Sequence, residues 1–151
     1  MIRYVLILVL AATVLGLTGT ALDHASAIRG EQAIETEIAA VDSAATSLYD
    51  LEGNPSKSGD TQRVIELDIP EERLTKGGTE TLRFERIADT ETTRVTYSVD
   101  ERIERTTIIR VPIRQADGGA VDFSGRTGTL RVLLTLETDQ SGEPVVTLSE
   151  Y

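Results

Sequence analysis

An uncharged stretch near the amino terminus constrains this chain more than any other feature. From Tyr4 to Leu22 no residue is charged. At about 1.5 Å of helical rise per residue, this stretch approaches the thickness of a membrane's hydrocarbon core, about 30 Å. Small residues and threonines weaken its second half, and such residues are tolerated where transmembrane helices pack together. We therefore expect a helix that either anchors the chain in a membrane or serves as a cleaved signal.

The two alternatives differ in what happens at Ala27. As a signal, the stretch would have Arg3 as its basic start and Ala25-Ser26-Ala27 as an A-x-A cleavage site. As an anchor, it would continue uncut into the next segment. We favour the anchor, because an amphipathic pattern begins shortly after Ala27. In either case Arg3 predicts a cytoplasmic N-terminus, with the rest of the chain outside.

Residues 23–52 are expected to form the amphipathic half of the same helix. Their apolar positions recur at the period of an α-helix and form one stripe: Ile28, Ile34, Ile38, Val41, Ala45 and Leu48. The acidic residues lie off this stripe and are interpreted as a solvated face. Gly30 lowers helix propensity by about 1 kcal/mol relative to alanine and is interpreted as a kink. Gly53-Asn54-Pro55 predicts the end of the helix.

Residues 53–151 are expected to form a β domain. Six stretches show the alternation of apolar and polar residues that is typical of strands: Arg63–Ile69, Thr81–Ala88, Thr92–Val99, Arg102–Arg114, Leu130–Thr138 and Val145–Tyr151. In the fourth stretch Ile103 shares the parity of the inner residues, and Pro112 predicts an edge or a bulge. Short connections favour an antiparallel meander with one wet face.

These segments together predict an α+β fold, divided into residues 1–22, 23–52 and 53–151. A long N-terminal helix, with a membrane half and an amphipathic half, would pack on an antiparallel meander of about six strands. A single sheet has one apolar face that needs cover, and residues 23–51 are the available helix. The residues expected to make this contact are Ile34, Ile38, Val41 and Leu48.

Residue types that carry chemistry are scarce. The sequence has no cysteine and one histidine, His24, which argues against a transition-metal site and against nucleophilic catalysis. Oxygen ligands for Ca²⁺ could come from Asp117, Asp122 and Asp139, but no EF-hand loop supports this. We expect no enzyme activity, no cofactor and no small-molecule substrate. The net charge of −10, from 25 acidic and 15 basic residues, argues against nucleic acid as a partner.

The layout resembles that of type IV pilins and pseudopilins, in which an apolar helix runs into an amphipathic helix that packs on an antiparallel sheet. The composition, with only Lys57 and Lys76 as lysines among the 15 basic residues, resembles that of proteins from salt-loving archaea. It is similar to that of small haloarchaeal membrane proteins which accompany pilus-type ATPase and platform components. The short leader Met1-Ile2-Arg3 and the absence of glutamate from Tyr4–Leu22 depart from the prepilin pattern. We therefore expect an accessory component.

The resemblance implies a membrane-anchored, pilin-like accessory component of an archaeal type IV pilus or secretion-type surface assembly, acting by protein–protein contacts. Its partners would be the membrane, other membrane or pilus-assembly proteins, or further copies of itself. Gly16 and Thr20 form a small-xxx-small pair and are expected to mediate contacts between transmembrane helices. The alternative is an extracytoplasmic β domain, secreted or anchored, that binds an unknown surface partner after cleavage at Ala27.

Overall fold

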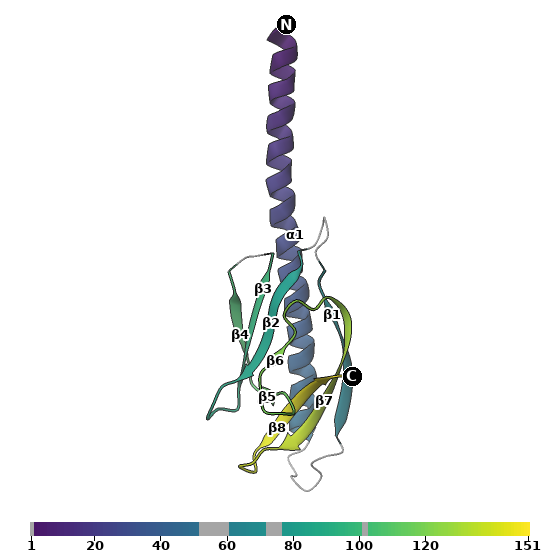
Figure 1. Cartoon of the computed structure of the whole chain (residues 1–151), viewed down its shortest axis with the longest axis vertical. Helices are drawn as coiled ribbons and strands as arrows, with labels where there is room; N and C mark the ends of the chain where they lie inside the picture. The colour runs from purple at the N-terminus through teal and green to yellow at the C-terminus, as the bar shows by residue number, and fades with distance from the viewer. Residues whose placement is uncertain (1, 52–60, 72–76, 101–102) are drawn as a thin grey trace.

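One long helix, α1 (Ile2–Leu51), organises the chain (Figure 1). The computed structural model describes residues 2–51, 61–71, 77–100 and 103–151, and within α1 it describes the side chains of residues 24–50. The C-terminal half of α1 lies among the strands, whereas its N-terminal half projects beyond them (Figure 1). The strands and the C-terminal half of α1 together form what we call the head.

The described strands form two four-stranded sheets that are mostly antiparallel. The first sheet has the order β1-β7-β8-β5, with bounds β1 (Gln62–Ile69), β7 (Gly128–Thr138), β8 (Pro144–Glu150) and β5 (Ile113–Arg114). The second has the order β4-β3-β2-β6, with bounds β4 (Arg105–Ile109), β3 (Thr93–Val99), β2 (Thr79–Arg86) and β6 (Val121–Asp122). Only the β5–β8 pair among these is parallel. The α+β class and the helix packed on antiparallel strands are confirmed.

The expected single meander differs from the observed arrangement, because the strand predicted over Arg102–Arg114 changes sheets. Its residues 105–109 form β4, and its last two residues are β5 on the other sheet. At the crossing, Pro112 has no N–H, and its carbonyl accepts a bond of 2.9 Å from the Val146 N–H. The buried Thr93 hydroxyl donates to the Val111 carbonyl and accepts from the Ile113 N–H, each at 2.7 Å. A threonine hydroxyl therefore supplies the bonds that a continuous strand would make.

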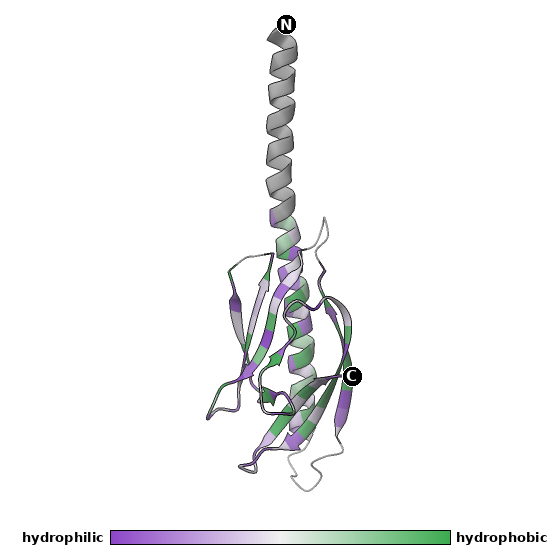
Figure 2. Cartoon of the chain, viewed as in Figure 1, coloured by the Kyte–Doolittle hydropathy of each residue, from purple (hydrophilic) through white to green (hydrophobic). Residues whose placement is uncertain are grey.

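The core forms where α1 meets both sheets, and Figure 2 shows hydrophobic residues along the part of α1 that lies among the strands. The fully or nearly fully buried residues include Ile34, Val41 and Leu48 of α1, Leu67, Leu134 and Leu148 of the first sheet, and Phe84, Val95 and Tyr97 of the second. Phe84 packs edge-to-face on Phe123, with 6.3 Å between ring centroids. The apolar face of each sheet is thus turned toward the same helix.

Two apolar residues do not lie where the periodicity placed them. Ile28 is 39 % exposed, because the helix turns Ala27 and Gly30 toward the strands instead. Ile103 is 90 % exposed, because it precedes β4 rather than lying within a strand. The predictions that both side chains face the core were therefore wrong.

The dependence of the head on α1 can be tested by placing a charge on the buried stripe. Val41 is fully buried, so Val41→Asp should lower the free energy of unfolding by about 3–5 kcal/mol, the typical cost of an unpaired buried charge. The neighbouring Ala40 is exposed, so Ala40→Asp should change it by no more than about 0.5 kcal/mol. Urea unfolding measures both variants. Equal midpoints would show that the helix is not part of the core.

Candidate functional site

The residues that the sequence singled out for packing lie inside the head. Ile34 and Val41 are fully buried, Leu48 is 3 % exposed and Ile38 is 6 % exposed. They belong to the core that α1 forms with the strands, so they hold the head to its helix. The residues of α1 that could contact a partner are therefore the polar ones that lie around this stripe.

The predicted anchor or signal segment, residues 1–22 with Gly16 and Thr20, lies outside the residues whose side chains are described. Across the rest of α1, no stretch is long and apolar enough to cross a membrane. The role of Gly16 and Thr20 stays a prediction.

A close backbone contact marks the point where α1 leaves the head. We call this point the shoulder and define it by Ser26, Gly30, Gly77, Gly78 and Asp100. The Gly77 N–H donates to the Ser26 carbonyl at 2.9 Å. A Cβ atom on Gly30 would lie 2.7 Å from the Gly77 carbonyl oxygen, closer than real Cβ contacts come. Gly30 is therefore needed for close approach. The interpretation of this glycine as a kink was wrong, because α1 continues through it.

Asp100 completes the shoulder with a pair of bonds to one glycine. Its N–H donates to the Gly78 carbonyl at 3.1 Å, and its carboxylate oxygen Oδ1 accepts from the Gly78 N–H at 2.8 Å. The backbone of Asp100 has φ 52°, a left-handed conformation that aspartate tolerates better than most residues. This carboxylate is therefore turned inward on the backbone.

Two glutamates on the polar face of α1 bind the second sheet rather than solvent alone. The Arg105 guanidinium lies 2.9 Å from a Glu31 carboxylate oxygen, and the Tyr97 hydroxyl donates to Glu35 Oε1 at 2.8 Å. Burial, together with the hydrogen bond to Glu35, raises the pKa of Tyr97 to about 12. The sequence could not indicate these contacts, because 62 residues separate Glu35 from Tyr97.

A groove of about 230 Å³ runs between α1 and β4. Its lining combines two carboxylates with apolar and hydroxyl groups: Glu35, Ile38, Ala39, Asp42, Tyr97, Thr107, Ile108 and Ile109. Among the described strands β4 pairs with β3 alone, so it is the edge strand of the second sheet. An acidic and apolar groove beside an edge strand is suited to binding another polypeptide.

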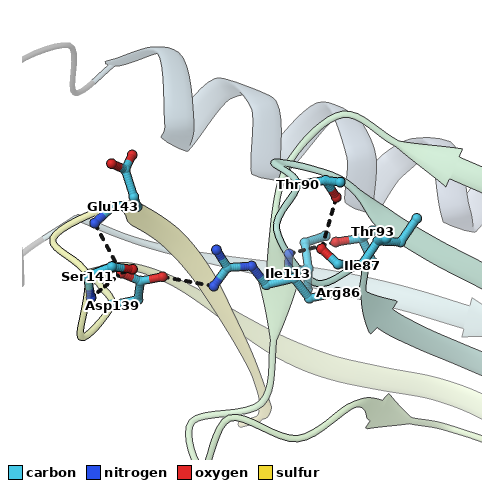
Figure 3. A network of polar contacts seen from close by, with 8 residues as sticks. All are labelled: Arg86, Ile87, Thr90, Thr93, Ile113, Asp139, Ser141 and Glu143. Carbon is cyan, nitrogen blue, oxygen red and sulfur yellow. Dashed lines mark hydrogen bonds and ion pairs between the residues drawn. The ribbon is translucent and has the colours of Figure 1, made fainter.

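At the far end of the head, Asp139 joins the two sheets (Figure 3). Its Oδ2 accepts from Arg86 of β2 at 2.9 Å, and its Oδ1 accepts from the Ser141 hydroxyl at 2.7 Å and from the Glu143 N–H at 3.1 Å. The hydrogen bond from Ser141, followed by that from Arg86, holds the pKa of Asp139 well below its ordinary range. The turn between β7 and β8 is thereby tied to the second sheet.

The three aspartates considered as calcium ligands serve separate turns. Asp117 accepts from the Gly119 N–H, and Asp122 accepts from the Ser124 N–H, in addition to the turn at Asp139. Within residues 24–50 and the described strands and loops, no group of three or more His, Cys, Asp or Glu side chains is placed to hold a metal ion. Each carboxylate therefore has a structural partner in its own turn.

The comparisons with known proteins give one match. The family model described as Domain of unknown function (DUF7311) matches residues 1–151. No curated protein and no solved structure matches the chain.

The close approach at Gly30 predicts an unusual response to alanine. In an ordinary helix Gly→Ala adds about 1 kcal/mol of stability. Here the new methyl would meet the Gly77 carbonyl and Val99, so Gly30→Ala should instead destabilise the head by about 1 kcal/mol or more. Gln32→Ala, at an exposed position two residues on, is the control and should be nearly neutral. Thermal unfolding of both variants decides the point, and stabilisation by Gly30→Ala would contradict the contact.

The contact between Tyr97 and Glu35 predicts a loss of stability at alkaline pH. The pKa of Tyr97 is raised from 10.0 to about 12 in the folded chain, so its stabilisation is complete below pH 10 and is lost as the pH rises toward 12. Tyr97→Phe should remove this part of the pH dependence and should cost about 1 kcal/mol at neutral pH. Urea unfolding across this pH range measures both effects. Tyr151→Phe, at an exposed position, is the control and should leave the pH dependence of the free energy of unfolding unchanged.

Proposed function

The chain belongs to the DUF7311 family, and we propose that it is a membrane-anchored, pilin-like accessory component of an archaeal type IV pilus or secretion-type surface assembly. It would act by protein–protein contacts, with its N-terminus cytoplasmic and its head outside. The observation that carries this proposal is that the head holds Ser26 and Ala27, two residues that signal cleavage would remove.

The shoulder favours a retained anchor over a cleaved signal. Ala27 is 1 % exposed and Ser26 is 8 % exposed, and the Ser26 carbonyl accepts the Gly77 N–H. A cut after Ala27 would remove both residues from their contacts and leave the Gly77 N–H without this partner. The A-x-A pattern is therefore better explained by small residues that fit beneath the strands. A secreted head that begins at Ile28 is accordingly the weaker alternative.

The shape of α1 supports a role in assembly. A helix of 50 residues is about 75 Å long, and its N-terminal half projects beyond the strands (Figure 1). The projecting half is left to meet other helices, where small residues such as Gly16 and Thr20 permit close packing. The groove beside β4 provides a second surface, outside the membrane, for a polypeptide partner.

The assembly role can be tested in the full-length chain by filling the small-residue face. Gly16→Leu with Thr20→Leu should leave the protein in the membrane fraction but reduce co-purification of two differently tagged copies, or of the partners. A loss of about 1 kcal/mol would weaken the association roughly fivefold. Ala11→Leu with Thr18→Leu adds the same two leucines on the opposite side by helical period and is the matched control.

Mass spectrometry of the mature N-terminus completes this test. The proposal is supported if the N-terminal segment is retained and association is lost in the variant with Gly16→Leu and Thr20→Leu but not in the control variant. A mature chain that begins at Ile28, with complexes that survive Gly16→Leu and Thr20→Leu, would refute it.

A further inference from the structure

The groove between α1 and β4 is too small for a helix or for a typical small-molecule ligand. Its volume is about 230 Å³, whereas a single helical turn, about 5.4 Å long and about 10 Å across, fills about 400 Å³. Pockets that enclose drug-sized molecules usually exceed about 300 Å³. One or two side chains of an extended polypeptide would fill this space. Every residue that lines the groove belongs to the described part of the chain.

The edge of β4 is suited to pairing with such a polypeptide. Among the described strands β4 pairs with β3 alone, and Figure 1 shows it at the margin of the head. Proteins usually protect edge strands with charged residues. The edge strand β1 of the first sheet has this protection, because Arg63, Glu66 and Asp68 are charged and exposed. In β4 the one charged residue is Arg105, and residues 106–109 are threonines and isoleucines, so this edge is the less protected one.

Asp42 gives the groove a negative charge that the head does not neutralise. Glu31 pairs with Arg105 at 2.9 Å, and Glu35 accepts a tyrosine hydroxyl of β3 at 2.8 Å. Asp42 also lines the groove, but it has no ion-pair partner among the described residues. Its hydrogen bond from the Thr46 hydroxyl is long, at 3.5 Å. The carboxylate of Asp42 is therefore available to an arginine or lysine of a partner.

Arg105 would not repel a cation placed at Asp42. Arg105 is held at Glu31, and Glu31 and Asp42 are eleven residues apart on α1, which corresponds to about 16 Å along the helix axis. Physiological salt screens exposed charges beyond about 8 Å. The two positive charges would therefore be largely independent. The basic side chain of the partner is expected at the end of the groove where Asp42 lies.

The outer face of β4 favours apolar residues in the same partner segment. Ile108 lies opposite Arg94 of β3 and is 51 % exposed, whereas the next residue, Ile109, is buried in the core. Side chains of a strand alternate between its two faces. A partner strand that directs one residue into the groove therefore places the residues on either side of it on the outer face, beside Ile108. Apolar residues there would cover this exposed side chain.

We propose that the head binds an extended segment of its partner polypeptide as an added strand along β4. An arginine or lysine of this segment pairs with Asp42 in the groove, and apolar residues of the segment lie beside Ile108. The inference rests on the protein–protein role in the proposed function, but not on the membrane anchor. Backbone hydrogen bonds to β4 supply the affinity, and the two side-chain contacts supply the selectivity.

The test uses the full-length chain in phosphatidylcholine nanodiscs and a synthetic probe, the capped peptide Thr-Val-Thr-Val-Arg-Val-Thr-Val-Thr. Its threonines and arginine share one face of the strand, and its valines share the other. Hydrogen exchange read by mass spectrometry locates the bound peptide, and fluorescence anisotropy measures its affinity. We expect slower exchange within Arg105–Ile109 and unchanged exchange within Gln62–Ile69, the edge strand of the other sheet.

A double-mutant cycle tests the ion pair. Asp42→Asn should weaken binding of the probe roughly tenfold, and glutamine in place of the probe's arginine should weaken it to the same extent. The two changes together should cost little more than either alone. Asp68→Asn removes the same charge at an exposed position of β1 and is the matched control, with an expected change of less than about twofold. Additive effects of the two changes would overturn the inference.

Two N-methylated probes test whether the peptide binds as a strand. The N–H groups of alternate residues point to the same edge of a strand. Methylation of the valine nitrogens therefore blocks one edge, and methylation of the threonine and arginine nitrogens blocks the other. One of these probes should fail to bind, and the other should keep most of the affinity. The same result from both would show that no strand is added.

Two further outcomes would also overturn the inference: no binding of the unmodified probe, or protection from exchange elsewhere in place of β4. Each of these results leaves the anchor standing, because none of them depends on the apolar segment. Conversely, failure of the experiment with Gly16→Leu and Thr20→Leu would refute the proposed function without changing the result at β4. The two failures are thus distinguishable.

Discussion

The burial of one apolar stripe on α1 is the interaction on which the rest of the head depends. Each sheet has one apolar face, and both faces join one core with α1. Because α1 contacts β1, β7 and β8 of the first sheet and β3 of the second, removal of the helix would expose both faces at once. We therefore expect the eight described strands to form one cooperative unit only with residues 24–50 in place.

Polar contacts then decide how α1 and the two sheets are oriented relative to one another. Glu31 and Glu35 connect α1 to the second sheet through Arg105 and Tyr97, and the bond from Arg86 to Asp139 connects that sheet to the first. Hydrogen bonds of this kind add only about 1 kcal/mol each, but they are directional where hydrophobic burial is not. Burial supplies most of the stability, while these bonds select one arrangement of helix and sheets.

The shoulder connects the fold to the proposed function. A head that begins to hold its helix at Ser26 leaves no flexible spacer between the strands and the apolar segment. A partner that binds the projecting helix would therefore determine the position of the head as well, and a contact made by the head would orient the helix. This rigid coupling is what an assembly component requires if it is to hold other proteins at a set distance from a membrane.

The sequence by itself determined the elements whose signal is local. The period of 3.6 placed Ile34, Ile38, Val41 and Leu48 on one face, and alternation found the regions of every described strand except β6, because side chains that face one core repeat with the geometry of their own element. Tertiary structure alone decided the rest. The exchange of sheets at Pro112, the role of Gly30, the exposure of Ile103 and the partners of Glu31 and Glu35 all depend on residues far away in the chain. Periodicity reports which face is buried, but it carries no information about which distant residue will lie there.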